Sequence, residues 1–157
     1  MRVVCQRVLQ AGVEINGQQV SQIDKGLLVY LSVGRTDTLK DAQFIADKLV
    51  NLRLFADEAG NPLGDASRQM NRSVLDVGGA ILLVSNFTIH GDCRKGRRPG
   101  FAAAAEPQLA QQLYEKVIAL VAEQGVIVEK GVFGEYMQVA STNDGPVTFL
   151  LDSSRLF

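Results

Sequence analysis

Short apolar runs separated by turn-forming residues dominate this chain and predict a protein built mainly from β-strands. Residues 2–9 alternate apolar and polar side chains, as a half-buried strand does. The segments 27–33 and 80–84 are uninterrupted apolar runs, typical of strands that are buried on both faces. Another strand is predicted over residues 126–132.

Two hairpins are predicted where turn-forming residues separate such runs. Asn16-Gly17 is a strong signal for a two-residue turn between antiparallel strands. Near the C-terminus, residues 136–140 and 147–151 are rich in β-branched and aromatic side chains and predict two more strands. Between them, the Asn-Asp-Gly of residues 143–145 predicts a turn, because these residue types tolerate positive φ or bond their own backbone. Pro146 lacks an N–H and belongs at a strand start or a sheet edge.

Two segments carry helical periodicity. Asp37 or Thr38 is a candidate N-cap for a helix that runs to about Phe55. Glu106-Pro107 predicts the start of a second helix, because proline suits a first turn and glutamate favours the positive end of the helix dipole. The stretch 57–72 is polar and glycine-rich, and predicts a loop or irregular ribbon.

Length and composition predict one soluble domain. The 157 residues suit a single domain spanning 1–157, and 46% hydrophobic with 21% charged residues is an ordinary globular balance. The fold class predicted is α+β, with a largely antiparallel, barrel-like sheet and two main helices. The first residues alternate like a strand rather than forming a signal peptide, and no apolar run approaches the ~20 residues of a membrane span, so we expect a cytoplasmic protein.

The buried run 80–84 leads into a segment that holds several candidate catalytic and binding side chains. If the strand continued through residues 85–92, Phe87 and Ile89 would share one face while Thr88 and His90 shared the other. A dense basic loop follows, comprising Arg94, Lys95, Arg97 and Arg98. Hydroxyls beside a cationic loop suggest an ester or phosphate-bearing ligand, whereas a solvated surface loop is the alternative. Because the formal net charge is only −1, any RNA contact would need this local patch.

The two cysteines are too few for a disulfide framework or a zinc cage. Cys5 lies in the first predicted strand and is expected to be a small core residue. Cys93 lies beside basic residues that favour a thiolate, but a catalytic cysteine needs a positioned base, and none is evident.

Two motifs together identify a family resemblance. Ser85-Asn86-Phe87-Thr88-Ile89 is similar to a Ser-Gln-Phe-Thr-Leu motif, and Asn143-Asp144-Gly145-Pro146-Val147-Thr148 matches an Asn-x-Gly-Pro-x-Thr motif. Both belong to the D-aminoacyl-tRNA deacylases, the chirality-proofreading enzymes of translation, and the resemblance extends over essentially the whole chain. Asn86 for Gln, Ile89 for Leu and Gly100 for a frequent Ser are departures from the family pattern.

This resemblance implies hydrolysis of the ester of D-aminoacyl-tRNA by a homodimer that uses no metal and no cofactor. Ser85, Phe87 and Thr88 would form the catalytic segment, mainly through backbone groups and pocket shape. Asn86, Asn143, Met137 and Arg7 would contribute to substrate binding, and Arg7 would support the Gly-Pro loop. The peptide bond between Gly145 and Pro146 would be cis and would enter the pocket of the partner subunit, where it would reject L-aminoacyl esters. Glycine has no side chain to reject, so mischarged glycyl-tRNA would be cleaved as well.

Three chemical routes and two further functions stay open at this stage. Thr88 could attack the ester with help from His90; backbone N–H groups near Phe87 could stabilise an oxyanion while water attacks; or the neighbouring ribose 2′-hydroxyl could assist that water. The resemblance favours the last two combined. Phe87 itself is expected to be a core residue. The alternative functions are a non-catalytic nucleic-acid-binding module, which would use the basic loop, and a generic small-ester hydrolase.

Overall fold

The computed structural model describes residues 1–57 and 70–156. In chain order the elements are β1 (Arg2–Ile15), β2 (Gln18–Ile23), β3 (Gly26–Ser32), α1 (Leu39–Asn51), β4 (Phe55–Ala56), β5 (Met70–Arg72), β6 (Ala80–Ser85), the 3-10 helix η1 (Phe87–His90), α2 (Pro107–Glu123), β7 (Ile127–Lys130) and β8 (Gln138–Asp152). Within this described part of the chain, no helix is both long and apolar enough to cross a membrane.

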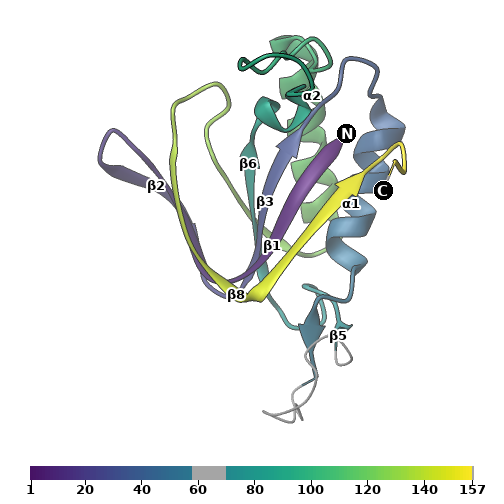
Figure 1. The fold of residues 1–157 in the computed structure, drawn as a ribbon. Helices are drawn as coiled ribbons and strands as arrows, with labels where there is room; N and C mark the ends of the chain where they lie inside the picture. Colours follow the sequence, from purple (N-terminus) through teal and green to yellow (C-terminus); the bar gives the residue numbers. More distant parts are fainter. Residues whose placement is uncertain (58–69, 157) are drawn as a thin grey trace.

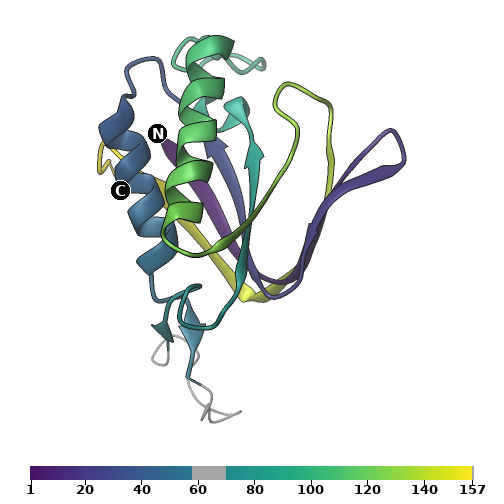
Figure 2. The same ribbon diagram turned by 180° about the vertical axis from the view of Figure 1, so that it is seen from behind.

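The long strand β1 organises the sheet. Its first half pairs antiparallel with β3, its second half pairs antiparallel with β2, and β8 pairs antiparallel along its other side. The sheet continues from β3 to β6 and β7 through parallel pairs, so it is mixed. Figure 1 shows β1 and β8 bending together so that the sheet curls into the predicted barrel-like shape. The helices α1 and α2 lie side by side against one face (Figure 2), which completes the predicted α+β architecture.

Alternation along the central strands divides the core into two layers. In β3, Leu27, Val29 and Leu31 face the helices, whereas Leu28 faces the inside of the curled sheet. β6 alternates in the same way, and both strands are buried on both faces, as their uninterrupted apolar runs predict. These strands therefore pack against the helices on one face and against a second apolar cluster, inside the curled sheet, on the other.

The local predictions for the first half of the chain are largely confirmed. Asn16 and Gly17 both adopt positive φ, 51° and 77°, at the tip of the β1–β2 hairpin. Thr38 caps α1 through a capping box with Asp41. The predicted end of this helix at Phe55 is wrong, because the chain turns extended at Leu52. The predicted loop or irregular ribbon over 57–72 falls mostly on residues 58–69, which lie outside the described residues. Met70–Arg72 form β5.

The predicted C-terminal hairpin is wrong, because β8 is one strand from Gln138 to Asp152. Its pairing with β1 continues on both sides of the motif: Gln6 pairs with Thr148 and Val8 pairs with Asn143. Over this interval β1 advances by two residues (6 to 8) while β8 advances by five (143 to 148). The extra residues bulge out of the strand rather than reversing it, since β1 offers a partner on both sides.

Candidate active site

A cavity of about 770 Å³ opens where two parallel strands end. β3 and β6 run parallel, so their carboxyl ends lie at the same edge of the sheet. The first turns of α2 and the segment before β8 close the other walls. The predicted site residues that line it are Ser85, Asn86, Phe87, Thr88 and Met137.

The segment after β6 forms the turn η1 instead of continuing as a strand, so the predicted alternation over residues 85–92 is wrong. Asn86 caps this turn, because its side-chain Oδ1 accepts hydrogen bonds from Thr88 N, at 3.2 Å, and from Thr88 Oγ1, at 2.5 Å. The shorter amide that replaces the family's Gln thus caps its own turn. The Asn86 N–H donates to Leu31 O at 2.8 Å, which fixes the start of η1 on β3.

Phe87 is 58% exposed, so its predicted place in the core is wrong. The turn points the ring outward along the cavity wall, where it meets Phe101 edge-to-face with ring centroids 5.0 Å apart. These two rings form an apolar rim between the cavity and the basic loop.

His90 does not face Thr88. It is buried at the end of η1, and its Nδ1 lies 2.6 Å from Ser32 Oγ. Burial lowers the pKa of the imidazole, and the nearby Arg2 cation lowers this pKa further, so the ring is neutral near pH 7. The Thr88 hydroxyl donates to Asn86 instead. A Thr88–His90 nucleophile and base are therefore not assembled in this arrangement.

The Gly145–Pro146 peptide bond is cis, as the resemblance implies. Both residues are exposed on the bulge of β8, and neither lines the cavity of its own chain. Asn143 holds the base of the bulge, because its Nδ2 donates to Arg7 O at 2.8 Å and to Val147 O at 3.1 Å. The motif is thus an exposed surface feature, held in place from below, that does not line the cavity of its own chain.

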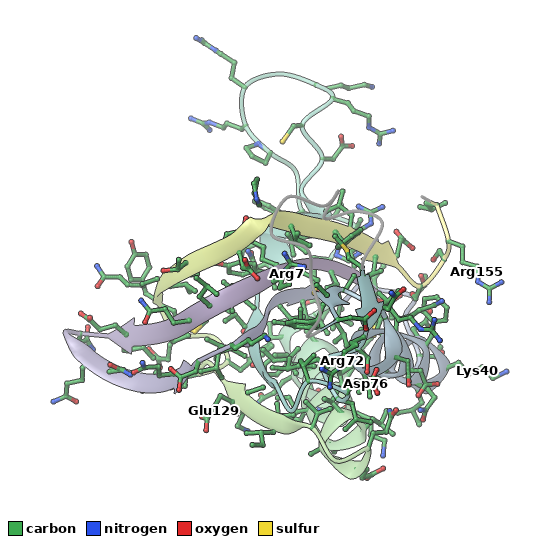
Figure 3. The ribbon with its side chains drawn as sticks, turned by 90° about the horizontal axis from the view of Figure 1, so that it is seen from below. Arg7, Lys40, Arg72, Asp76, Glu129 and Arg155 are labelled. Atoms are coloured by element: carbon green, nitrogen blue, oxygen red, sulfur yellow. The ribbon has the colours of Figure 1, made fainter. Side chains whose placement is uncertain are left out.

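Arg7 is buried beneath this bulge, with 8% of its surface exposed (labelled in Figure 3). Its Nη1 donates to Leu54 O at 2.7 Å, and its Nε lies 2.9 Å from Asp144 Oδ2. The guanidinium therefore links Asp144, the residue before Gly145, to Leu54 in the segment between α1 and β4. Arg7 and Asp144 also line a second, smaller cavity of about 360 Å³, separate from the first.

Several residues that line the cavity were not predicted from the sequence. Tyr114 is buried in α2, and its hydroxyl donates to Leu83 O at 2.8 Å. Burial raises the pKa of this phenol, so it stays protonated. Phe133 lies beside it, with ring centroids 5.9 Å apart. Other residues of the wall that were not predicted include Tyr30, Ser32, Phe101 and Tyr136. In the sequence these residues have the same pattern as core residues, so only the tertiary fold separates them.

The basic loop extends from the same edge. Asp92 and Gly100 pair their backbones at 2.7 and 2.9 Å, so the loop has a fixed base next to Phe101. Arg94 pairs with Asp92 at 2.7 Å, which lowers the pKa of that carboxyl. The loop stands away from the body of the molecule (Figure 3), with its four cationic residues exposed: Arg94, Lys95, Arg97 and Arg98.

Comparisons with known proteins show the family of this chain. The family model described as D-Tyr-tRNA(Tyr) deacylase matches residues 4–152. A D-aminoacyl-tRNA deacylase of Fervidobacterium nodosum is 51% identical over 100% of both chains, and one of Thermus aquaticus is 53% identical over 98% of this chain and 96% of its own. A solved structure titled c-Myc DNA unwinding element binding protein superposes with a TM-score of 0.88 at 36% identity, covering 97% of this chain and 98% of the other. The family model and these relatives show that the chain belongs to the class of aminoacyl-tRNA deacylases. The chain belongs to the D-Tyr-tRNA(Tyr) deacylase family.

Proposed function

We propose that this protein hydrolyses the ester bond of D-aminoacyl-tRNA in the cytoplasm, releasing a free D-amino acid and tRNA. The arrangement that carries this proposal is the cavity floored by Ser85, Asn86 and the η1 turn, in a chain that belongs to this family. A cavity of about 770 Å³ has room for the aminoacylated terminal nucleoside of a tRNA.

Backbone groups do most of the chemistry in this proposal. The N–H groups of Phe87 and Thr88 lie at the start of a helical turn, where backbone donors lack intrahelical partners. They would stabilise the oxyanion that forms when a water oxygen attacks the ester carbonyl. The ester C–O bond then breaks, and the proton lost by the water reaches the ribose 3′-oxygen through the neighbouring 2′-hydroxyl of the tRNA. Ser85, Asn86 and Thr88 shape this turn.

Chirality would be read by the bulge of a second subunit. Gly145 and Pro146 are exposed, and their own chain does not use them in its cavity. In a homodimer, the backbone carbonyls of this bulge would enter the partner's cavity and hold the α-ammonium group. The side chain of an L-residue would then collide with the same backbone. Met137 would pack against the substrate, and Arg7 with Asn143 would keep the bulge in place.

The exposed basic loop would bind the phosphates of the tRNA 3′ end. Its base lies at the Phe87–Phe101 rim of the cavity, so cations and cavity are adjacent. Such contacts raise affinity without reading sequence, and they weaken with salt.

Turnover of D-tyrosyl-tRNA by the purified protein tests the activity, with D-tyrosine ethyl ester as a matched substrate that lacks tRNA. We expect rapid release of D-tyrosine from the tRNA and little from the simple ester. Equal rates on both would point to a generic ester hydrolase.

A non-catalytic binding module is the second candidate, because a similar solved structure is named for binding a DNA element. It would be favoured by steeply salt-dependent nucleic-acid binding with no release of D-tyrosine.

Mixed dimers test the shared site. One subunit would carry Gly145→Trp and the other Phe87→Pro, which removes a backbone N–H of η1. If the bulge acts in the partner's cavity, one of the two cavities in each heterodimer pairs two intact elements and regains activity. Heterodimers as inactive as both parent homodimers would rule out this sharing.

A further inference from the structure

Ser32 and His90 form a buried polar pair beneath η1 that the chemistry above does not use. Ser32 ends β3 with 1% of its surface exposed, and His90 ends η1 with 8% exposed. Ser32 Oγ lies 2.6 Å from His90 Nδ1 and 3.4 Å from the carbonyl oxygen of Phe87. The hydroxyl therefore lies between the only histidine of the sequence and the backbone of the proposed oxyanion site.

One proton decides how these groups are connected. A serine hydroxyl can donate only one hydrogen bond, so Ser32 donates either to His90 or to Phe87 O. If the imidazole proton is on Nδ1, His90 donates to Ser32, and Ser32 donates to Phe87 O. If the proton is on Nε2, Ser32 must donate to Nδ1, and the Phe87 carbonyl loses this partner.

We propose that His90 is a positioning residue that carries its proton on Nδ1 and, through Ser32, orients the peptide between Phe87 and Thr88. This inference rests on the proposed function, in which the Thr88 N–H faces the oxyanion. The carbonyl of Phe87 and the N–H of Thr88 belong to one planar peptide unit and point in opposite directions. Holding the carbonyl toward β3 therefore directs the N–H away from it, on the cavity side of the turn.

The neighbouring hydrogen bonds hold the residues on either side of the Phe87–Thr88 peptide, and the contact from Ser32 holds its carbonyl. Asn86 N donates to Leu31 O at 2.8 Å, which fixes the residue before the peptide. Gly91 N donates to Thr88 O at 2.9 Å, which closes the turn after it. The peptide between them has its carbonyl held by Ser32 and its N–H contacted by Asn86 Oδ1 at 3.2 Å. When substrate arrives, the N–H must exchange that long bond for the oxyanion, and the carbonyl contact keeps the plane from rotating.

The imidazole tautomer can be measured without any substrate. Because the chain has a single histidine, protein labelled with 15N in histidine gives the signals of one ring. Two-bond 15N–1H correlation at a pH above the lowered pKa of His90 should show Nδ1 protonated and Nε2 unprotonated. Ser32→Ala should weaken this preference, while Ser21→Ala, which removes a buried hydroxyl on β2 outside the cavity wall, should not. A wild-type ring protonated on Nε2 would overturn the proposal.

Kinetics test the consequence. Ser32→Ala and His90→Leu should each lower kcat for D-tyrosyl-tRNA by about tenfold or more with KM little changed, because only the transition state needs the oriented N–H. His90→Asn should rescue most of this loss, since its amide nitrogen can occupy the place of Nδ1. Ser32→Ala and His90→Leu combined should cost no more than either alone.

Folded variants with unchanged kcat, or with only KM raised, would overturn the positioning role. If the wild-type protein itself shows no deacylation, the proposed function fails, whereas the tautomer measurement still decides the Ser32–His90 contact. The two failures are therefore distinguishable.

Discussion

The Asn143 side chain donates a hydrogen bond to the backbone carbonyl of Arg7, at 2.8 Å across the β1–β8 pair. Its second bond, to Val147 O, spans the bulge that contains Gly145 and Pro146. One amide thus joins the two strands at the place where their register shifts. The bulge owes its shape to side chains beneath it as well as to its own backbone.

Replacing Asn143 by Ala should destabilise the bulge. Two partly buried carbonyls would lose their donor, which typically costs about 1–3 kcal/mol of unfolding free energy. Urea unfolding measures the loss, and D-tyrosyl-tRNA turnover should fall with it. Asn143→Gln should not restore either property, because a longer amide cannot keep both bonds. Wild-type stability and activity in the Asn143→Gln variant would contradict this role.

Gly145→Ala should abolish most of the activity. An added Cβ would lie 2.5 Å from Val147 Cγ2, on a residue with φ of +139° that side chains rarely adopt. We expect kcat/KM for D-tyrosyl-tRNA to fall by about a hundredfold or more, since small displacements at a site cost that much. Gly17→Ala is the matched control, because Gly17 also has positive φ but faces open space at a hairpin tip. Similar losses in both variants would mean that general strain, not the bulge, is responsible.

Thr88→Ala should keep substantial activity, within about tenfold of wild type. The hydroxyl is bonded to Asn86 and lies away from His90, so it serves the turn rather than the ester. Steady-state kinetics on D-tyrosyl-tRNA check this. A loss of about a thousandfold or more, the scale of a removed nucleophile, would revive threonine attack.

Removing the cations of the basic loop should weaken tRNA binding without slowing chemistry. Lys95→Ala, Arg97→Ala and Arg98→Ala combined should raise KM and leave kcat nearly unchanged. The slope of log KM against log salt concentration should fall by about 2–3, because each lost phosphate contact removes about 0.7–0.9 from it. Arg94 is left in place because it is paired with Asp92. The control is Lys40→Ala with Arg155→Ala, exposed residues elsewhere (Figure 3). An equal effect of the control would remove the loop from the tRNA site.

The pH dependence of stability should carry the signature of His90. Burial, Arg2 and the Met1 ammonium lower the pKa of His90 in the folded state. Asp37 and Asp152 raise it, but the net effect is a lowered pKa. The unfolded chain therefore binds the proton more readily, so stability is lost as pH falls from about 6.5, the unfolded pKa, through the folded value. Relative to His90→Asn, the wild-type unfolding free energy should decrease between pH 7.5 and pH 5 at fixed protein concentration. A constant difference would show that the imidazole does not titrate in this way.

The two cysteines should differ sharply in reactivity. Cys5 is buried in the core as predicted, and burial raises the pKa of its thiol to about 12, whereas Cys93 is exposed in the basic loop. Titration with a thiol reagent should modify one cysteine in the folded protein and both in denaturant. Rapid modification of two thiols under native conditions would contradict the burial of Cys5.

Turn residues, a helix cap and apolar runs predict the parts of this fold that depend on local sequence. The Asn16-Gly17 turn, the Thr38 cap and the apolar runs of β3 and β6 carry their own signals, and each is confirmed. The bulge at Gly145 is different, because the same Asn-Asp-Gly residues suit a hairpin or a bulge. The long partner strand β1 decides between them, and it lies more than a hundred residues away.

In the candidate site, too, some residues can be predicted from the sequence and others only from the tertiary fold. Its motif residues Ser85, Asn86 and Thr88 are visible in sequence. The turn they form, however, includes a hydrogen bond donated by Thr88 N–H to Asn86 Oδ1, which competes with strand continuation. Ser32 and Tyr114 come from distant elements, and their residue types alone fit an ordinary core. Only the parallel pairing of β3 with β6 brings Ser32 under η1.

Side-by-side deacylation of D-tyrosyl-tRNA and L-tyrosyl-tRNA, with a chelator present, tests most directly whether the Gly145–Pro146 bulge selects chirality. We predict rapid release of D-tyrosine and release of L-tyrosine no faster than in buffer alone. Cleavage of both esters at similar rates would contradict a backbone wall that rejects the L form, and cleavage of neither would contradict the deacylase function itself.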